Sequence, residues 1–202
     1  MYDAILFDFD GVLADTEPIH WACWSHVLAP CGLHLDWETY RACCIGIPDL
    51  DVIGLVVKRC NSTLDARELF ERLYPLKKAR FNEVTLAEPP ISAGMIAFVQ
   101  SLHGYKLAVV TSSGRMEIEP LLVKTGLRPA FDVLLAGEDV TRLKPAPDPY
   151  LLAAKLLGAK KALVVEDSPA GLESGRAGGF DILAVPDAAH TPELVRAKLQ
   201  AG

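Results

Sequence analysis

Short apolar runs alternate with segments of helical periodicity along most of the chain. The first run, from Ala4 to Phe7, ends directly in charged residues and predicts a short buried strand of a parallel sheet. Similar runs predict four more strands, at 106–110, 132–136, 162–165 and 181–185. The segments around them predict helices over 92–102, 117–125, 150–157, 170–177 and 192–200. Strands that alternate with helices predict an α/β fold with a parallel sheet and right-handed crossovers.

The segment after the first predicted strand has a different pattern. It contains no convincing strand, and its apolar residues recur at helical spacing from about Glu17 to about Val84. Helices are expected to begin near Glu17 and to cover 36–44, 49–60 and 65–80. We therefore predict a helical domain of residues 16–86, inserted into an α/β domain of residues 1–15 and 87–202.

Two side-chain sets in this helical segment are assigned to its core and to its surface. The tryptophans Trp21, Trp24 and Trp37 are expected in the core. The basic group Lys77, Lys78 and Arg80 is interpreted as a solvated helix face.

Composition and net charge disfavour two classes of partner. The chain has 202 residues, half of them apolar, and a net charge of −6, which disfavours nucleic acid and anionic membranes as partners. No apolar run reaches the roughly 20 residues of a membrane helix, and no basic, signal-like segment precedes the first strand.

Five cysteines without a Cys-x-x-Cys pair indicate reduced thiols. We expect a cytoplasmic protein that is a monomer or a weak dimer.

Two carboxylates follow the first predicted strand. Asp8 and Asp10 stand at its exit, where ligands bind in open α/β sheets, and Gly11 lets the backbone turn beside them. Such close carboxylates repel each other unless a cation lies between them, so a divalent ion is expected. A calcium loop is disfavoured because Gly11 comes too early. Aspartates that only cap a turn remain an alternative.

Polar residues of complementary kinds follow the other strands. Because parallel strands all point the same way, these groups are expected along one rim of the sheet. They are the hydroxyls of Thr111 and Ser112, the amine of Lys144, and the carboxylates of Glu166 and Asp167. A rim of this composition can hold a divalent metal beside an anion, which suits phosphoryl transfer.

Each of these residues has an expected role in that chemistry. Asp8 is the candidate nucleophile that forms an aspartyl-phosphate, and Asp10 is the candidate general acid and base. Asp167, Asp8 and the backbone carbonyl of Asp10 are the expected metal ligands, with Glu166 as an outer partner or a ligand through water. Lys144 and Thr111 are expected to bind the phosphate.

Four segments of the chain resemble the four motifs of the haloacid dehalogenase-like hydrolase superfamily. They are DFDGVLADT, VVTSSG, KPAPDPY and VVEDSPAG, in this order. The resemblance is narrower to the subgroup that contains small-molecule phosphatases and beta-phosphoglucomutase. It implies a Rossmann-like core with a mobile helical cap and magnesium as cofactor. By this likeness Asp8 matches the nucleophile and Asp10 the acid and base. Thr111 and Lys144 match the phosphate binders, and Glu166 and Asp167 match the acidic metal pair, so Asp8, Asp10, Glu166 and Asp167 are the predicted metal site. It also implies a small phosphorylated metabolite as the ligand, and we predict that Gly11, Ser112 and His20 bind this phosphate or substrate together with Thr111 and Lys144.

The resemblance leaves three functions open. An aspartate at position 10 favours phosphate esters, so a phosphatase is the leading hypothesis. A sugar-phosphate mutase is the second, because His20 stands where mutases and many phosphatases carry a histidine, but it could also be a hinge or surface residue. Against the mutase, Asp49 takes the place where its phosphate-binding arginine is expected. A metal- or phosphate-binding regulatory module without turnover is the third.

Overall fold

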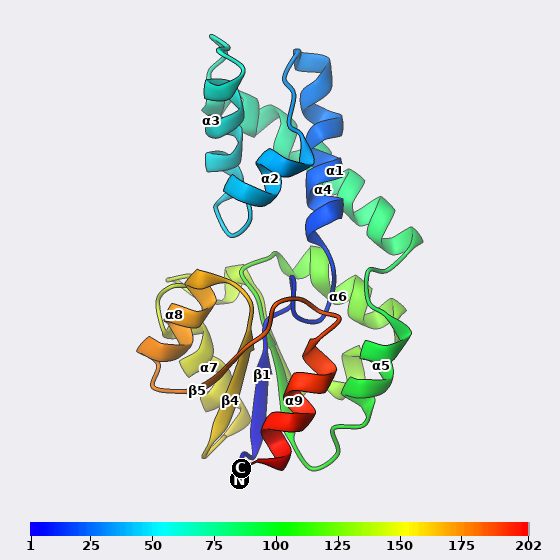
Figure 1. The fold of residues 1–202 in the computed structure, drawn as a ribbon, viewed down its shortest axis with the longest axis vertical. Coiled ribbons are helices and arrows are strands. Elements are labelled where there is room, and N and C mark those ends of the chain that lie inside the picture. The colour runs from blue at the N-terminus through cyan, green and yellow to red at the C-terminus, as the bar shows by residue number, and fades with distance from the viewer. Residues whose placement is uncertain (202) are drawn as a thin grey trace. The chain divides into compact units, whose positions relative to one another are not determined.

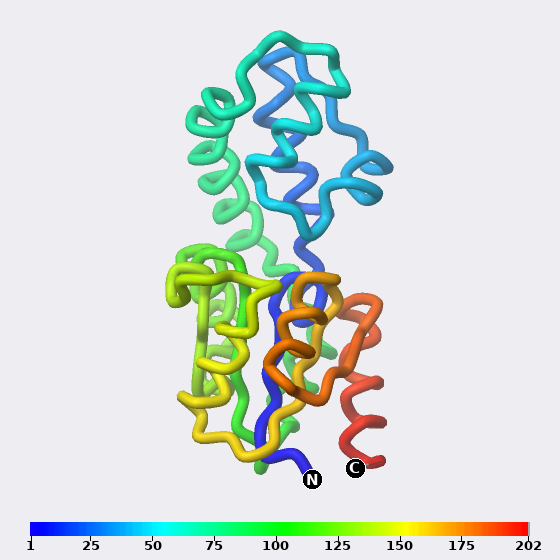
Figure 2. Tube along the Cα trace, turned by 90° about the vertical axis from the view of Figure 1, so that its left-hand side faces the viewer, coloured from blue at the N-terminus to red at the C-terminus, as the bar shows by residue number. Residues whose placement is uncertain are grey.

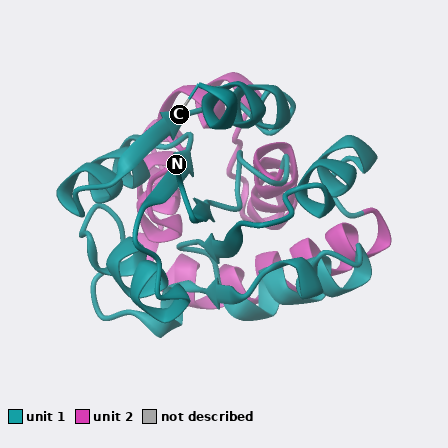
Figure 3. Cartoon of the chain, turned by 90° about the horizontal axis from the view of Figure 1, so that it is seen from below, with its two compact units in different colours: residues 1–15, 89–202 teal, residues 16–88 magenta. Residues whose placement is uncertain are grey.

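A computed structural model describes residues 1–201, and these divide into two compact units. Residues 1–15 and the chain from Pro89 onward form the α/β unit, and Thr16–Glu88 form the helical unit, drawn in teal and magenta in Figure 3. The α/β unit is therefore made of two stretches of chain that the helical unit separates in sequence. Within residues 1–201, none of the helices has the length and apolar composition needed to cross a bilayer.

The α/β unit contains a five-stranded parallel sheet in the order β3-β2-β1-β4-β5. Its strands are β1 (Ala4–Phe7), β2 (Lys106–Val110), β3 (Val133–Leu135), β4 (Ala162–Glu166) and β5 (Asp181–Ala184). Figure 2 shows β1 between β2 and β4. Phe7 is in register with Val109 of β2 and Val165 of β4, so these strands end at nearly the same level. The predicted α/β fold is confirmed.

Helices cover both faces of this sheet (Figure 1). They are α5 (Ala93–Gln100), α6 (Arg115–Lys124), α7 (Asp148–Leu157), α8 (Pro169–Ala177) and α9 (Thr191–Gln200), with short 3-10 turns at Arg128–Ala130 and Gly137–Asp139. Helices α7 and α8 pack together against one face, and α5 and α9 pack together at the other. Helix α6 begins two residues earlier than predicted because Glu117 accepts a hydrogen bond from the Gly114 amide, which caps it.

Both faces of β1 are buried, and all four of its side chains are excluded from solvent. Leu6 belongs to an apolar cluster that includes Tyr150 and Ala153 of α7. Phe7 points to the other face, where its ring meets that of Phe98 in α5 edge to face at 6.3 Å. Packing on both sides therefore fixes the strand that leads into Asp8.

The helical unit contains α1 (Glu17–Leu28), α2 (Trp37–Cys43), α3 (Asp49–Arg59) and α4 (Ala66–Ala87), with a 3-10 turn at Ala29–Cys31. Two aspartates cap its helices: Asp36 accepts from the Thr39 amide before α2, and Asp65 accepts from two amides before α4. Helix α4 runs seven residues further than predicted. Buried residues continue its inward face at Phe81 and Thr85, and packing extends the helix.

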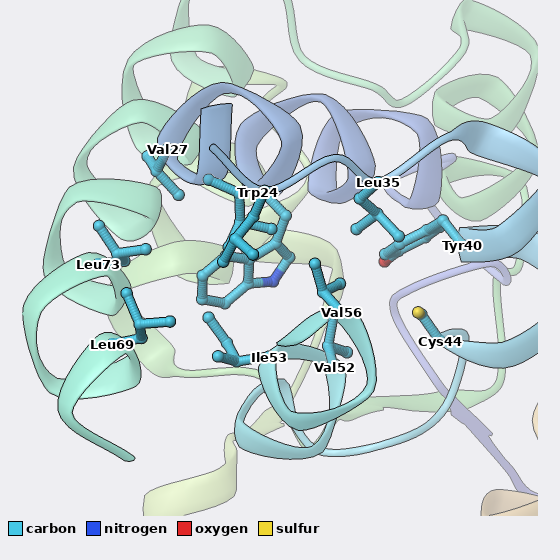
Figure 4. Close-up of a cluster of buried hydrophobic side chains, with 12 residues drawn as sticks. Trp24, Val27, Leu35, Tyr40, Cys44, Val52, Ile53, Val56, Leu69 and Leu73 are labelled. Carbon is cyan, nitrogen blue, oxygen red and sulfur yellow. The ribbon is translucent and has the colours of Figure 1, made fainter. Parts of the chain in front are cut away.

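An apolar cluster of buried side chains forms the core of the helical unit (Figure 4). Trp24 is fully buried in it, and Trp21 and Trp37 pack against it, as predicted. The interpretation of Lys77 as part of a solvated face is wrong. Only 2% of its side chain is exposed, and its ammonium lies 3.5 Å from Asp49 Oδ2 and 5.7 Å from the centre of the Trp24 ring.

Candidate active site

The first predicted site residues lie where β1 ends. The Asp8 amide donates to the carbonyl of Val165 at 3.0 Å, which continues the strand pairing past Phe7, and the Asp8 side chain is buried. The chain then turns at Gly11, whose amide donates to the Ala14 carbonyl and whose φ is +77°. A Cβ at Gly11 would collide with Asp167 Oδ2, so glycine is required for both conformation and space.

Lys144 links the ends of three strands. Its ammonium lies 2.6 Å from Asp8 Oδ1, 2.6 Å from Glu166 Oε1 and 2.9 Å from the carbonyl oxygen of Val110. The side chain is only 5% exposed. The amine is therefore a buried cation held at the carboxyl ends of β1, β2 and β4.

Glu166 is the last residue of β4 and is fully buried. Its Oε1 accepts from Lys144 and from the Tyr150 hydroxyl, and its Oε2 accepts from the amides of Asp167 and Ser168 and from the Ser168 hydroxyl. Gly171 in α8 leaves the room this carboxylate occupies, because a Cβ there would overlap Glu166 Oε1. The acid thus organises the loop between β4 and α8.

The hydroxyl groups after β2 contact Asp10. The Ser113 hydroxyl donates to Asp10 Oδ2 at 2.6 Å, and the Thr111 hydroxyl lies 3.4 Å from the same oxygen. Thr111 also accepts from the Ser113 amide, which stabilises the turn. Ser112 is exposed to solvent and makes neither contact. Ser113 is not among the predicted site residues, although it belongs to the same VVTSSG segment.

Charge at the site is strongly unbalanced toward carboxylates. Burial raises the pKa of Asp8 well above its usual value, and the nearby charges of Glu166, Asp10 and Asp167 raise it further against the opposing effect of Lys144. For Glu166, burial acts in the same direction, but Lys144 and the hydrogen bonds outweigh it and lower the pKa. A further cation near Asp8 would keep its carboxyl ionised.

Three carboxylates are suitably placed to hold such a cation. Oxygen atoms of Asp8, Glu166 and Asp167 lie within 4.8 Å of one another. An all-oxygen, carboxylate-rich set fits a hard divalent cation such as Mg²⁺. The side chain of Asp10 does not belong to this group, which leaves its backbone carbonyl as the predicted ligand.

The remaining predicted residue, His20, lies in α1 of the helical unit. Its ring stacks on that of Phe81 in α4, with centres 4.3 Å apart and planes 10° from parallel. The structure thus brings together Asp8, Asp10, Gly11, Thr111, Lys144, Glu166 and Asp167 within the α/β unit. A contact of His20 with substrate stays a prediction.

The chain is similar in sequence and in structure to known proteins over nearly its whole length. The chain is 33% identical to fructose-1-phosphate phosphatase YqaB of Escherichia coli K12, over 91% of this chain and 96% of that protein. It is 36% identical to hexitol phosphatase A of the same organism, over 94% of this chain and 85% of that protein. The structure of CbbY from Rhodobacter sphaeroides in complex with phosphate has 30% identity and a TM-score of 0.73, over 92% of this chain and 87% of that one. Residues 5–185 match the family described as haloacid dehalogenase-like hydrolase. The resemblance of the four motifs is confirmed, and the chain belongs to this family of hydrolases.

Proposed function

We propose that the chain is a phosphatase that hydrolyses the monoester of a small phosphorylated metabolite, such as a sugar phosphate, through an aspartyl-phosphate on Asp8. The observation that carries this proposal is the contact of Lys144 with Asp8 Oδ1 at 2.6 Å, beside the Asp167 carboxylate. At this contact the proposed nucleophile Asp8 lies beside the proposed phosphate-binding cation Lys144 and the proposed metal ligand Asp167.

In the first step, an oxygen of Asp8 attacks phosphorus and the bond from phosphorus to the ester oxygen breaks. Lys144 stabilises the phosphoryl oxygens, since charge neutralisation is the main requirement of this transfer. In the second step, water attacks the phosphorus of the aspartyl-phosphate, which releases inorganic phosphate and restores the Asp8 carboxylate. Atoms and charge balance over the two steps.

Asp10 supplies the proton that the leaving alkoxide requires. It lies two residues beyond Asp8, and the Ser113 hydroxyl holds its Oδ2 at 2.6 Å. The same carboxyl group then accepts a proton from the attacking water. Positioned acid and base catalysis of this kind contributes roughly 10²–10⁴-fold to the rate.

Asp8, Asp167 and the Asp10 carbonyl are the proposed ligands of Mg²⁺, with Glu166 beside them. When bound, the ion supplies positive charge that keeps Asp8 ionised and neutralises the phosphoryl oxygens. The unbalanced carboxylates of the site support this assignment.

The proposed substrate class follows from the relatives, two of which are named as phosphatases of fructose 1-phosphate and of hexitol phosphates. A mutase additionally has to hold a second phosphate group. Asp49, which stands where its arginine is expected, accepts from Trp24 Nε1 at 2.7 Å and lies near Lys77. A carboxylate cannot take the phosphate-binding role expected of that arginine, which favours hydrolysis over the mutase. The predicted cytoplasmic location and monomer or weak-dimer state stay predictions.

The test is phosphate release from sugar, hexitol, glycerol and nucleotide monophosphates with Mg²⁺ present, with Asp8→Asn as the control variant. We expect release from at least one sugar or hexitol phosphate and none from the variant. Intact mass measured after trapping with a metal fluoride is expected to show an adduct on wild type only. Isomer formation without free phosphate would establish the mutase instead. Binding of phosphate without turnover of any ester would establish the regulatory module.

A further inference from the structure

A buried tyrosine touches the same carboxylate oxygen as Lys144. Tyr150 of α7 is fully buried, and its hydroxyl donates to Glu166 Oε1 at 2.9 Å. The Lys144 ammonium, itself 2.6 Å from that oxygen, lies 4.9 Å from the centre of the Tyr150 ring. The tyrosine therefore contacts the acid through its hydroxyl and the amine through its ring face.

Glu166 has little capacity left for another partner. The two donors at Oε1 and the three at Oε2 occupy the roughly four lone-pair positions that a carboxylate offers. A carboxylate that the protein itself saturates is a poor direct metal ligand. It is well suited to hold the groups that donate to it, and among these is Lys144.

We propose that Tyr150 is a positioning residue, which holds Glu166 as an anchor for Lys144 and leaves Asp8 and Asp167 to face the metal ion. This inference rests on the proposed function, because Lys144 is the group assigned to the phosphate. Without the hydroxyl, Glu166 Oε1 keeps only Lys144 as a partner. The carboxylate keeps its donors at Oε2 but loses the second anchor at Oε1, so the oxygen that holds the ammonium can shift at the point where phosphate has to bind.

The molecule carries a matched arrangement on its surface. The Tyr2 hydroxyl donates to Asp181 Oδ2 at 3.0 Å, and Lys161 lies 5.0 Å from the centre of the Tyr2 ring and 3.5 Å from the same carboxylate. A tyrosine, a lysine and a carboxylate meet in both places, but Lys161 and Asp181 are about half exposed. Tyr2→Phe therefore removes the same kind of hydrogen bond away from the site.

The experiment compares Tyr150→Phe with Tyr2→Phe and with Ala153→Gly. Ala153 is fully buried in α7, so its replacement by glycine lowers helix stability without touching Lys144 or Glu166. Affinity for inorganic phosphate is measured by calorimetry with Mg²⁺ present, and kcat and KM are measured with a hydrolysed ester. We expect Tyr150→Phe to weaken phosphate binding about five- to tenfold and to raise KM more than it lowers kcat. Both other variants are expected to bind phosphate as wild type does.

Two outcomes overturn the inference. One is a phosphate affinity of Tyr150→Phe equal to that of Tyr2→Phe. The other is a fall in Tm like that of Ala153→Gly with phosphate binding unchanged, which would make the hydroxyl a packing element only. If wild type hydrolyses no ester while Tyr150→Phe still weakens phosphate binding, the proposed function fails and the positioning role stands.

Discussion

Lys144 Nζ lies 2.6 Å from Asp8 Oδ1, although 136 positions separate the two residues in the chain. Three neighbouring parallel strands end at nearly the same level, and this topology brings the pair together. Both side chains are almost completely buried, so their attraction is weakly screened by water and salt.

Replacement of Lys144 by methionine is expected to lower kcat/KM by about 10²–10³-fold, because the phosphoryl oxygens lose their buried cation. The pKa of Asp8 rises further in this variant, since Lys144 is the group that lowers it. Steady-state kinetics with Mg²⁺ present checks the prediction. Lys161→Met, at an exposed ion pair of the same unit, is the control. Equal activity of the two variants would contradict the role of Lys144.

Gly11→Ala tests the close approach of the first turn to Asp167. The alanine Cβ would lie 2.8 Å from Asp167 Cγ, in a backbone with φ of +77°. We expect activity to fall about 100-fold because the metal ligand is displaced, and stability to fall by more than about 1 kcal/mol. Gly104→Ala has a similar φ of +88°, but among residues 1–201 no atom beyond its chain neighbours lies within 4 Å of the added Cβ, so it isolates the backbone effect. Kinetics and thermal unfolding of both variants separate displacement from strain.

Chelation of divalent cations is expected to abolish hydrolysis, and Mg²⁺ is expected to restore it. The ion relieves repulsion among Asp8, Glu166 and Asp167, so it also raises the Tm of the resting protein. Differential scanning fluorimetry against Mg²⁺ concentration measures this rise without any substrate. Asp167→Asn should remove most of it. A Tm that does not respond to Mg²⁺ in wild type would exclude the proposed metal site.

The strands and the main site residues were predictable because both depend on local sequence. Apolar runs that end in polar residues mark where each strand stops, and parallel topology then gathers those ends. Contacts made across elements were not predictable. The hydroxyl of Ser113 reaches Asp10 from another strand end, and Lys77 is buried by Trp24 and Asp49 of other helices. A lysine beside Lys78 in an amphipathic helix carries no local signal of burial.

The carboxylate of Asp36, which caps α2, is expected to make the stability of the protein depend on pH. Hydrogen bonds from the Thr39 amide and hydroxyl, at 2.7 and 2.8 Å, lower the pKa of Asp36 below its usual value of 3.8. A carboxyl whose pKa is lower in the folded state stabilises the protein above the unfolded-state pKa, and this contribution is lost as pH falls through the folded-state pKa. Asparagine caps about as well but carries no charge. Asp36→Asn should therefore lower Tm slightly at pH 7 and have no effect well below pH 3.8. An effect of equal size at both pH values would contradict this.

The ion pair of Lys77 and Asp49 predicts unequal losses of stability when one or the other residue is replaced. Asp49 is about one third exposed and also accepts from Trp24 Nε1, so it keeps a partner and solvent when the lysine is removed. Lys77 is 2% exposed, lies among the rings of Trp24, Tyr74 and Phe81, and loses its carboxylate when Asp49 is removed. We expect Asp49→Ala to lower the free energy of unfolding by about 2–3 kcal/mol, because it leaves a buried cation without an anion.

Lys77→Met is expected to change the same free energy by less than about 1 kcal/mol, since an apolar chain of similar length fills the space. Urea unfolding followed by tryptophan fluorescence measures both variants, because Trp24 lies beside the pair. In the double variant, methionine at position 77 should recover the part of the loss that comes from the buried charge, whereas the part that comes from the unpaired Trp24 Nε1 stays. Equal destabilisation by the two single variants, with effects that add in the double variant, would contradict the prediction. Asp49 would then not stabilise the protein by balancing the buried charge of Lys77.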